Sequence, residues 1–247
     1  MPESSYDPLD SSCFPLIPYC NRLKEGRFHW RRRTISLPLN FLPELNTLHG
    51  LAWQSLWEIE QKSISQVNLR WVYSGHELWI SPYRTEQTIT LDEDGCEVAL
   101  ALANAGSGTM PAGLGLHPYF RRRPETRVRF EAESVLLSDA ASMPTGIEAP
   151  AAHFADFAQG DALPRATIDH CWRGWGGTVT IEDDLGTIAM SASGAPHLHV
   201  YAPADGSALC FEPVSHTPDA LNRVPGEMIA LEPGETARLT MRIEATS

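Results

Sequence analysis

Two segments place an ionisable side chain among apolar residues, at positions where it could transfer a proton. His117 lies in GLGLHPYF (113–120), and Glu212 lies in LCFEPVSHTPDALN (209–222). Histidine gains or loses a proton near neutral pH with little tuning, and apolar neighbours raise the pKa of a carboxyl toward the range useful for proton transfer. The two segments could therefore supply a general acid and a general base. A structural histidine and a solvent-facing glutamate are the alternatives that these patterns leave open.

Alternation along an extended GLGLHPYF segment predicts how His117 is held. Gly113, Gly115, His117 and Tyr119 would share one face of the strand, with the leucines and Pro118 on the other. The leucines would anchor the strand in the core, and the glycines would leave space beside the imidazole for a small ligand. Because Pro118 restricts the preceding backbone to extended conformations, we expect the imidazole to be aimed in one direction.

The segment NTLHGLAW (46–53) combines a histidine with aromatic residues. His49 precedes a glycine and is close in sequence to Trp53 and Trp57. The C–H face of a sugar ring stacks on an indole, while its hydroxyls need directional hydrogen-bonding partners. The segment therefore fits a sugar site, although clustered tryptophans also build an ordinary core.

The remaining histidines carry weaker signals. His197 and His199 form H-x-H in PHLHVY, which on a strand points both rings to one face and could bind a metal. No carboxylate follows nearby to complete a compact metal motif, so we interpret both as core or wall histidines. Surface or structural roles are expected for four others: His29, His76, His153 and His170.

The elements that must hold these residues are predicted to be short antiparallel strands. Alternating segments separated by turn residues are typical of an antiparallel sandwich or barrel. Two hairpins are indicated, one over 88–102 that turns at Asp94-Gly95 and one over 178–192 that turns at 183–186. Further strands are predicted at 56–61, 67–73, 127–137, 197–201, 208–211 and 237–244. Since no segment has a sustained helical period and no linker divides the chain, we predict one all-β domain over residues 1–247.

The charge of the chain limits its partners. The 31 acidic and 19 basic residues give a formal charge of −12, which would repel a phosphate backbone and an anionic membrane surface alike. We therefore expect no nucleic-acid partner and no membrane partner. Two arginine triplets, at 31–33 and 121–123, could hold a phosphate, but such runs are more typical of a solvated strand end or loop.

Cysteine usage and the N-terminal sequence bear on the cellular compartment. The five cysteines are odd in number and form no C-x-x-C pair, which is typical of reduced thiols. No apolar run approaches the roughly 20 residues of a membrane span, and MPESSYDPLDSS lacks the pattern of a signal peptide. These features predict a cytoplasmic protein.

Taken together, the motifs resemble those of the galactose mutarotase-like aldose 1-epimerase family. YCNRLKEGRF (19–28) is similar to the family's asparagine-arginine segment, NTLHG (46–50) to its first histidine motif and GLGLHPYF to its second. IDHCW (168–172) resembles the aspartate segment, and CFEPVSHTPDALN (210–222) the glutamate strand. Each motif is weak alone, but five in the family's order over residues 15–225 make a specific resemblance.

The resemblance implies a β-sandwich of the supersandwich type, with a small-molecule sugar bound in a groove on one concave sheet. It implies that His117 is the general acid that protonates the ring oxygen, and that Glu212 is the general base that deprotonates the anomeric hydroxyl. Arg22, His49 and Asp169 would hold the sugar hydroxyls. Neither a metal nor an organic cofactor is expected.

Two departures from the family pattern carry expectations of their own. The asparagine-arginine segment begins at Asn21, so N-terminal strands that usually precede it are expected to be missing, and an uncovered sheet edge would favour homo-oligomers. The aspartate segment continues as DHCWRGWGG, whose tryptophans would alter which sugars fit.

Two other functions remain open at this stage. One is a hexose-6-phosphate 1-epimerase, in which Arg22 and the triplet at 121–123 would clamp the phosphate, because the planar guanidinium fork suits that task. The other is a carbohydrate-binding protein without turnover. The presence of both His117 and Glu212 argues against it, since binding alone needs neither a proton donor nor an acceptor there.

Overall fold

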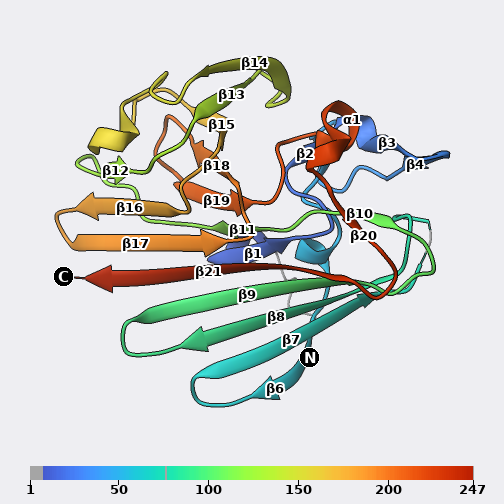
Figure 1. The fold of residues 1–247 in the computed structure, drawn as a ribbon. Helices are drawn as coiled ribbons and strands as arrows, with labels where there is room; N and C mark the ends of the chain where they lie inside the picture. Colours follow the sequence, from blue (N-terminus) through green and yellow to red (C-terminus); the bar gives the residue numbers. More distant parts are fainter. Residues whose placement is uncertain (1–7, 76, 247) are drawn as a thin grey trace.

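The structure, a computed structural model, describes residues 8–75 and 77–246, and most of its regular structure is antiparallel β-strand (Figure 1). The prediction of an all-β fold is confirmed. His76, one of the histidines expected to have a surface or structural role, lies outside the described residues.

The larger sheet has eight strands and lies along the lower part of Figure 1. In spatial order its strands are β12 (Arg127–Arg129), β16 (Thr178–Asp183), β17 (Gly186–Ser193), β21 (Thr236–Thr246), β9 (Gly95–Asn104), β8 (Tyr83–Leu91), β7 (Gln66–Tyr73) and β6 (Glu58–Lys62). Both predicted hairpins are confirmed, as β8 with β9 and β16 with β17.

The second sheet has seven strands and carries most of the motifs discussed above. In spatial order its strands are β1 (Cys13–Leu16), β11 (Gly115–Pro118), β19 (Cys210–Val214), β18 (His197–Ala202), β15 (Ile168–Arg173), β13 (Ser134–Ser138) and β14 (Pro144–Pro150). The strand predicted over 127–137 is wrong in its extent, because its two halves are β12 and β13, which belong to different sheets.

Shorter elements complete the described chain. Three further strand pairs are β2 (Arg22–Leu23) with β5 (Thr47–Leu48), β3 (Arg27–Trp30) with β4 (Arg33–Ser36), and β10 (Met110–Ala112) with β20 (Ile229–Leu231). One α-helical turn, α1 (Ala220–Arg223), and four 3-10 turns (Lys24–Gly26, Ala52–Gln54, Phe157–Gln159 and Pro225–Glu227) lie between strands, and a fifth 3-10 turn (Pro8–Asp10) precedes β1. No helix in residues 8–75 and 77–246 is long and apolar enough to cross a membrane.

The main hydrophobic core joins the two sheets. Leu116, Leu198 and Phe211 extend from one face of the seven-stranded sheet and are fully buried, in the same cluster as Leu100 and Met241 of the eight-stranded sheet. Because side chains alternate along a strand, the neighbours of these core residues point to the opposite face. That opposite face is where a ligand site can form.

Replacement of Leu116 by alanine tests the anchoring of β11 in this core. Because Leu116 is fully buried, we expect Leu116→Ala to lower the free energy of unfolding by about 2–5 kcal/mol, as measured by urea denaturation. The matched control is Val72→Thr at a largely exposed position of β7, for which the change should stay within about 0.5 kcal/mol. A loss for Leu116→Ala as small as that of the control would contradict this packing.

Candidate active site

Antiparallel register brings the candidate catalytic residues into one row across the seven-stranded sheet. Phe14 pairs with His117, His199 with Glu212, and Cys171 with His199. The pairs Gly115↔Val214 and Tyr119↔Cys210 on either side fix the register of β11 with β19, so that His117 also lies opposite Glu212. We call these five residues (Phe14, His117, Glu212, His199 and Cys171) the site row. They occupy the face that points away from the main core.

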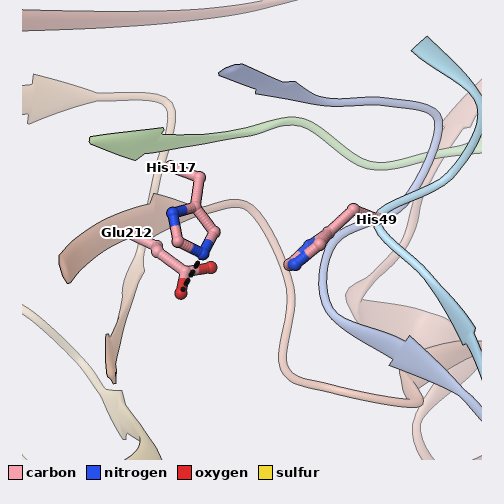
Figure 2. A group of neighbouring side chains, drawn as sticks. All are labelled: His49, His117 and Glu212. Carbon is pink, nitrogen blue, oxygen red and sulfur yellow. Dashed lines mark ion pairs between the residues drawn. The ribbon is translucent and has the colours of Figure 1, made fainter. Parts of the chain in front are cut away.

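The two candidate catalytic groups are in direct contact. His117 Nε2 lies 3.3 Å from Glu212 Oε1, and both side chains are almost completely buried (Figure 2). The imidazole packs against the rings of Phe14 and Tyr119, at centroid distances of 4.6 and 4.8 Å. Burial lowers the pKa of His117, an effect that the charge of Glu212 partly opposes. Both groups also line a cavity, so the arrangement suits proton exchange with a ligand bound there.

His49 approaches the pair from a separate segment (Figure 2). Its ring stands edge-on to that of His117, with centroids 5.4 Å apart. The backbone N–H of His49 donates to the backbone carbonyl of Asn21 at 2.9 Å. In return, the backbone N–H of Asn21 donates to Nδ1 of the His49 ring at 3.2 Å. Both residues have positive φ, 59° and 58°, a strained conformation that this reciprocal pair of hydrogen bonds maintains.

The structure explains why the NTLHG motif ends in a glycine, Gly50. A Cβ atom on Gly50 would lie 2.1 Å from the carbonyl oxygen of Ile17. That carbonyl accepts a hydrogen bond from the backbone N–H of Leu51 at 2.8 Å. The close approach of the two segments at glycine therefore sets the position of His49.

The three residues in Figure 2 also invite comparison with a metal centre. One potential ligand atom from each of His49, His117 and Glu212 lies within 4.8 Å of the others. However, His49 Nδ1 accepts the Asn21 N–H, so the neutral ring carries its hydrogen on Nε2. Burial, reinforced by the charges of His117 and Arg22, lowers the pKa of His49 well below its usual value and keeps the ring neutral. His49 therefore offers a ligand a hydrogen-bond donor, and this tautomer disfavours metal binding through Nε2.

A charged cluster stands beside the catalytic pair. His199 Nε2 lies 2.7 Å from Asp169 Oδ1, and the side-chain amide of Asn21 lies 3.2 Å from the same nitrogen. Arg22 Nη1 lies 3.5 Å from Asp169 Oδ2, and Arg22 Nε donates to Glu44 at 2.8 Å. The two carboxylates and two cations neutralise one another within the wall of the site.

The pKa values in this cluster favour a fixed ion pair. Burial opposes a charge on His199, but the hydrogen bond to Asp169 outweighs it, with help from Cys171 and Glu212, and raises the pKa of His199 to about 10. Burial likewise opposes the charge of Asp169, yet the hydrogen bond to His199 holds the pKa of that carboxyl at about 2. At neutral pH His199 is an imidazolium and Asp169 a carboxylate.

These residues line one cavity of about 240 Å³, and all five predicted site residues, Arg22, His49, His117, Asp169 and Glu212, are among its walls. Aromatic and apolar side chains form much of the rest, including Phe14, Trp53, Phe41 and Tyr201. Trp57, the second tryptophan considered near His49, is not in the lining. The cavity thus combines ring faces with convergent polar groups, as a sugar site requires.

Besides the two tyrosines of the lining, the cavity has two polar residues to which the sequence assigned no site role, His199 and Asn21. The H-x-H pattern had marked His199 as a core or wall residue, and it does form part of the wall. Its ion pair with Asp169 depends on the pairing of β15 with β18, which spacing within one strand cannot reveal. His197, the other member of the pattern, is absent from the lining and lies 3.9 Å from Glu227.

Two expectations about the motif glycines and tryptophans are wrong. A Cβ on Gly113 would lie 2.3 Å from His216 Nε2, and a Cβ on Gly115 would lie 2.8 Å from Cys20 Sγ, so protein atoms fill the space expected for a ligand. Trp172 and Trp175 are buried in the main core and do not line the cavity. They cannot select sugars by direct contact.

The pH dependence of stability tests the His199–Asp169 ion pair. Since the folded pKa of His199 is raised from 6.5 to about 10, its contribution is full below pH 6.5 and is lost as the pH rises toward 10. The excess stability of the wild type over His199→Gln should therefore shrink between pH 6 and pH 9.5 in urea denaturation. His29→Gln at an exposed position is the control. A constant excess across this range would rule out the charged pair.

Comparisons with known proteins agree with the fold. The sequence profile of the family described as aldose 1-epimerase matches residues 4–244. The chain is 34% identical to the uncharacterized protein YphB of Escherichia coli K12 over 95% of this chain and 84% of that protein. It is 25% identical to the uncharacterized protein YihR of the same organism, over 92% and 77%.

Solved structures show the same architecture. An aldose 1-epimerase family structure from Escherichia coli K12 superposes with a TM-score of 0.89 at 31% identity, covering 97% of this chain and 85% of that one. A galactose mutarotase-like protein from Clostridium acetobutylicum has a TM-score of 0.83 at 17% identity, covering 96% and 79%, and so supports the fold alone. The described chain has the galactose mutarotase-like fold, and it belongs to the aldose 1-epimerase family.

Proposed function

We propose that the protein is an aldose 1-epimerase that interconverts the α and β anomers of a hexose. The observation that carries this proposal is the contact of 3.3 Å between His117 Nε2 and Glu212 Oε1 inside a cavity lined by aromatic rings and hydrogen-bonding groups. Membership of the aldose 1-epimerase family supports the same reaction class.

Anomerisation requires a general acid and a general base that lie close together, as His117 and Glu212 do. Ring opening removes a proton from the anomeric hydroxyl and delivers one to the ring oxygen, and both oxygens are bonded to the same carbon. Glu212 would take the first proton as general base, and His117 would give the second as general acid. The C1–C2 bond then rotates, and the ring closes on the other face with the two groups in exchanged roles. No redox partner is needed, because the anomeric carbon keeps its oxidation state when the ring opens and closes.

The remaining walls suit the hydroxyls and the C–H face of a sugar. His49 Nε2–H and the Arg22 guanidinium would donate hydrogen bonds, and Asp169 would accept them. Because Asp169 is already paired with His199 at 2.7 Å, its carboxylate is held in place before the sugar binds, which reduces the entropy cost of binding. Phe14 and Trp53 offer ring faces for stacking.

A free sugar is favoured over a phosphorylated one. Arg121 and Arg123 form ion pairs with Asp183 and Asp184, and Arg122 donates to the carbonyl oxygens of Pro203 and Pro164. This triplet is therefore already engaged and is absent from the cavity lining. Arg22, the remaining candidate for a phosphate clamp, is shared between Glu44 and Asp169. The negative charges near a dianionic phosphate in this cavity would outnumber the positive charges free to bind it.

Substitution of the catalytic pair tests the proposed roles. Glu212→Gln and His117→Asn should each lower kcat for anomeric exchange by a factor of about 10² to 10⁴, since each removes one proton-transfer group. Sugar affinity, measured by calorimetry, should change little. His29→Asn is the matched control outside the cavity. Exchange rates near the wild-type value in either variant would contradict the proposed mechanism.

The pH profile provides a separate check. The reaction needs one proton on the His117–Glu212 pair, and the pKa of His117 is lowered by burial from 6.5. Above the pKa of this acid, which lies below 6.5, we expect kcat/KM to fall by about tenfold per pH unit. The values of kcat/KM are corrected for solvent catalysis. NMR exchange measurements from pH 5 to pH 8 would show this limb. A constant kcat/KM between pH 6 and pH 8 would contradict the assignment of the acid.

A further inference from the structure

Residues 215–223, which follow strand β19, are hydrogen-bonded to the asparagine-arginine segment. The backbone N–H of Asp219 donates to the carbonyl oxygen of Arg22 at 3.0 Å, and the Asp219 carboxylate accepts the backbone N–H of Lys24 at 3.1 Å. The strand that carries Glu212 is thus tied, through the residues that follow it, to the segment that carries Arg22.

His216 makes the contact of this kind that lies nearest to the site. Its side chain is almost completely buried, and its Nε2 accepts the backbone N–H of Cys20 at 3.0 Å. The other ring nitrogen, Nδ1, therefore carries the hydrogen and donates it to the carbonyl oxygen of Thr217 at 2.8 Å. Burial lowers the pKa of His216 to about 4. The ring is consequently neutral at neutral pH, and Nε2 remains an acceptor.

The neighbours of His216 hold its ring in one orientation. The hydroxyl and the backbone N–H of Thr217 both donate to Glu227, at 2.6 and 3.0 Å, and Glu227 also accepts a hydrogen bond from Arg173 at 3.1 Å. On another side of the ring, a Cβ atom on Gly113 would overlap with His216 Nε2. The first glycine of GLGLHPYF is therefore required by the His216 ring.

The backbone amide that His216 binds belongs to the residue before Asn21. The backbone N–H of Asn21 donates to His49 Nδ1 at 3.2 Å, which leaves the hydrogen of the neutral His49 ring on Nε2. Both Asn21 and His49 line the cavity, as does Arg22, the next residue in the chain. A change in the orientation of the backbone before Asn21 would therefore disturb the two groups expected to donate hydrogen bonds to the sugar.

We propose that His216 is a positioning residue of the active site. Its Nε2 holds the backbone of Cys20 and, through it, the Asn21 N–H that selects the tautomer of His49. His216 is absent from the cavity lining, so it affects sugar binding through His49 and Arg22 and leaves proton transfer unchanged. The kinetic part of this inference rests on the proposed anomerase function, whereas the effect on the His49 ring does not.

Two polar substitutions separate the acceptor of His216 from the rest of its ring. Glutamine can place an oxygen where Nε2 lies, whereas the shorter asparagine reaches only the position of Nδ1. Nitrogen-15 NMR spectra show which nitrogen of His49 carries the hydrogen. We expect the hydrogen on Nε2 in the wild type and in His216→Gln, and a mixture of both tautomers in His216→Asn.

His170→Gln is the matched control for this spectroscopic experiment. The Nδ1 atom of His170 also accepts a backbone N–H, that of Ser138 at 3.0 Å. The substitution removes a hydrogen bond of the same kind on a segment that does not contact His49. The tautomer of His49 should therefore be the same in His170→Gln as in the wild type.

Anomeric exchange kinetics provide the second readout, with glucose and galactose as substrates. His216→Asn should raise KM by about tenfold and change kcat by less than about threefold, because the sugar-binding groups move while the proton-transfer pair does not. His216→Gln should keep KM within about threefold of the wild-type value. A histidine that only filled space would give similar changes in both variants.

The outcomes distinguish this proposal from the proposed function. A wild-type tautomer of His49 in His216→Asn would overturn the role of His216, as would an unchanged KM in a protein that exchanges anomers. If His216→Asn does not fold, Gly113→Ala replaces it, because the added Cβ would displace the His216 ring without removing it. Absence of turnover by the wild type would overturn the anomerase function, and the His49 tautomers would still decide the role of His216.

Discussion

The register of five antiparallel strands is the constraint on which the site depends. Side chains directly opposite one another across β1, β11, β19, β18 and β15 form the site row, which places His117, Glu212 and His199 side by side. A slip of one residue would turn every one of these groups toward the opposite face. The leucines on the core face of the same strands make such a slip costly. Hydrophobic packing on one face therefore fixes the positions of the ionisable side chains on the other.

Burying this many ionisable groups in one row requires compensation. The Glu212 carboxylate is almost completely buried, and its neighbours in the row are two imidazoles, His117 and the charged His199. The His199 charge is in turn held by Asp169. Charge balance therefore extends across three strands, from the groups proposed to transfer protons to those proposed to bind sugar hydroxyls. Such a preorganised arrangement would lower the reorganisation needed during the proposed reaction.

Local patterns predicted the strands and several of their residues, because alternation and Asp-Gly turns act within a few residues. They placed His117 on an extended segment, indicated both hairpins and excluded long helices. They could not predict that residues 127–137 divide between two sheets, that His216 fills the space beside Gly113, or that His199 pairs with Asp169. Each of these depends on which distant strands become neighbours, and one sequence does not encode that in its local spacing. The assembly of Arg22, His49 and Asp169 around the pair was expected only from the family resemblance.

The most direct test of the account is the anomeric exchange rate of the unmodified protein with free hexoses. NMR exchange spectroscopy on a panel of aldohexoses should show, for at least one sugar, exchange between α and β anomers well above the rate in buffer alone. Binding of these sugars by calorimetry, without any exchange above the solvent-catalysed rate, would contradict the account and would identify the cavity as a binding site only.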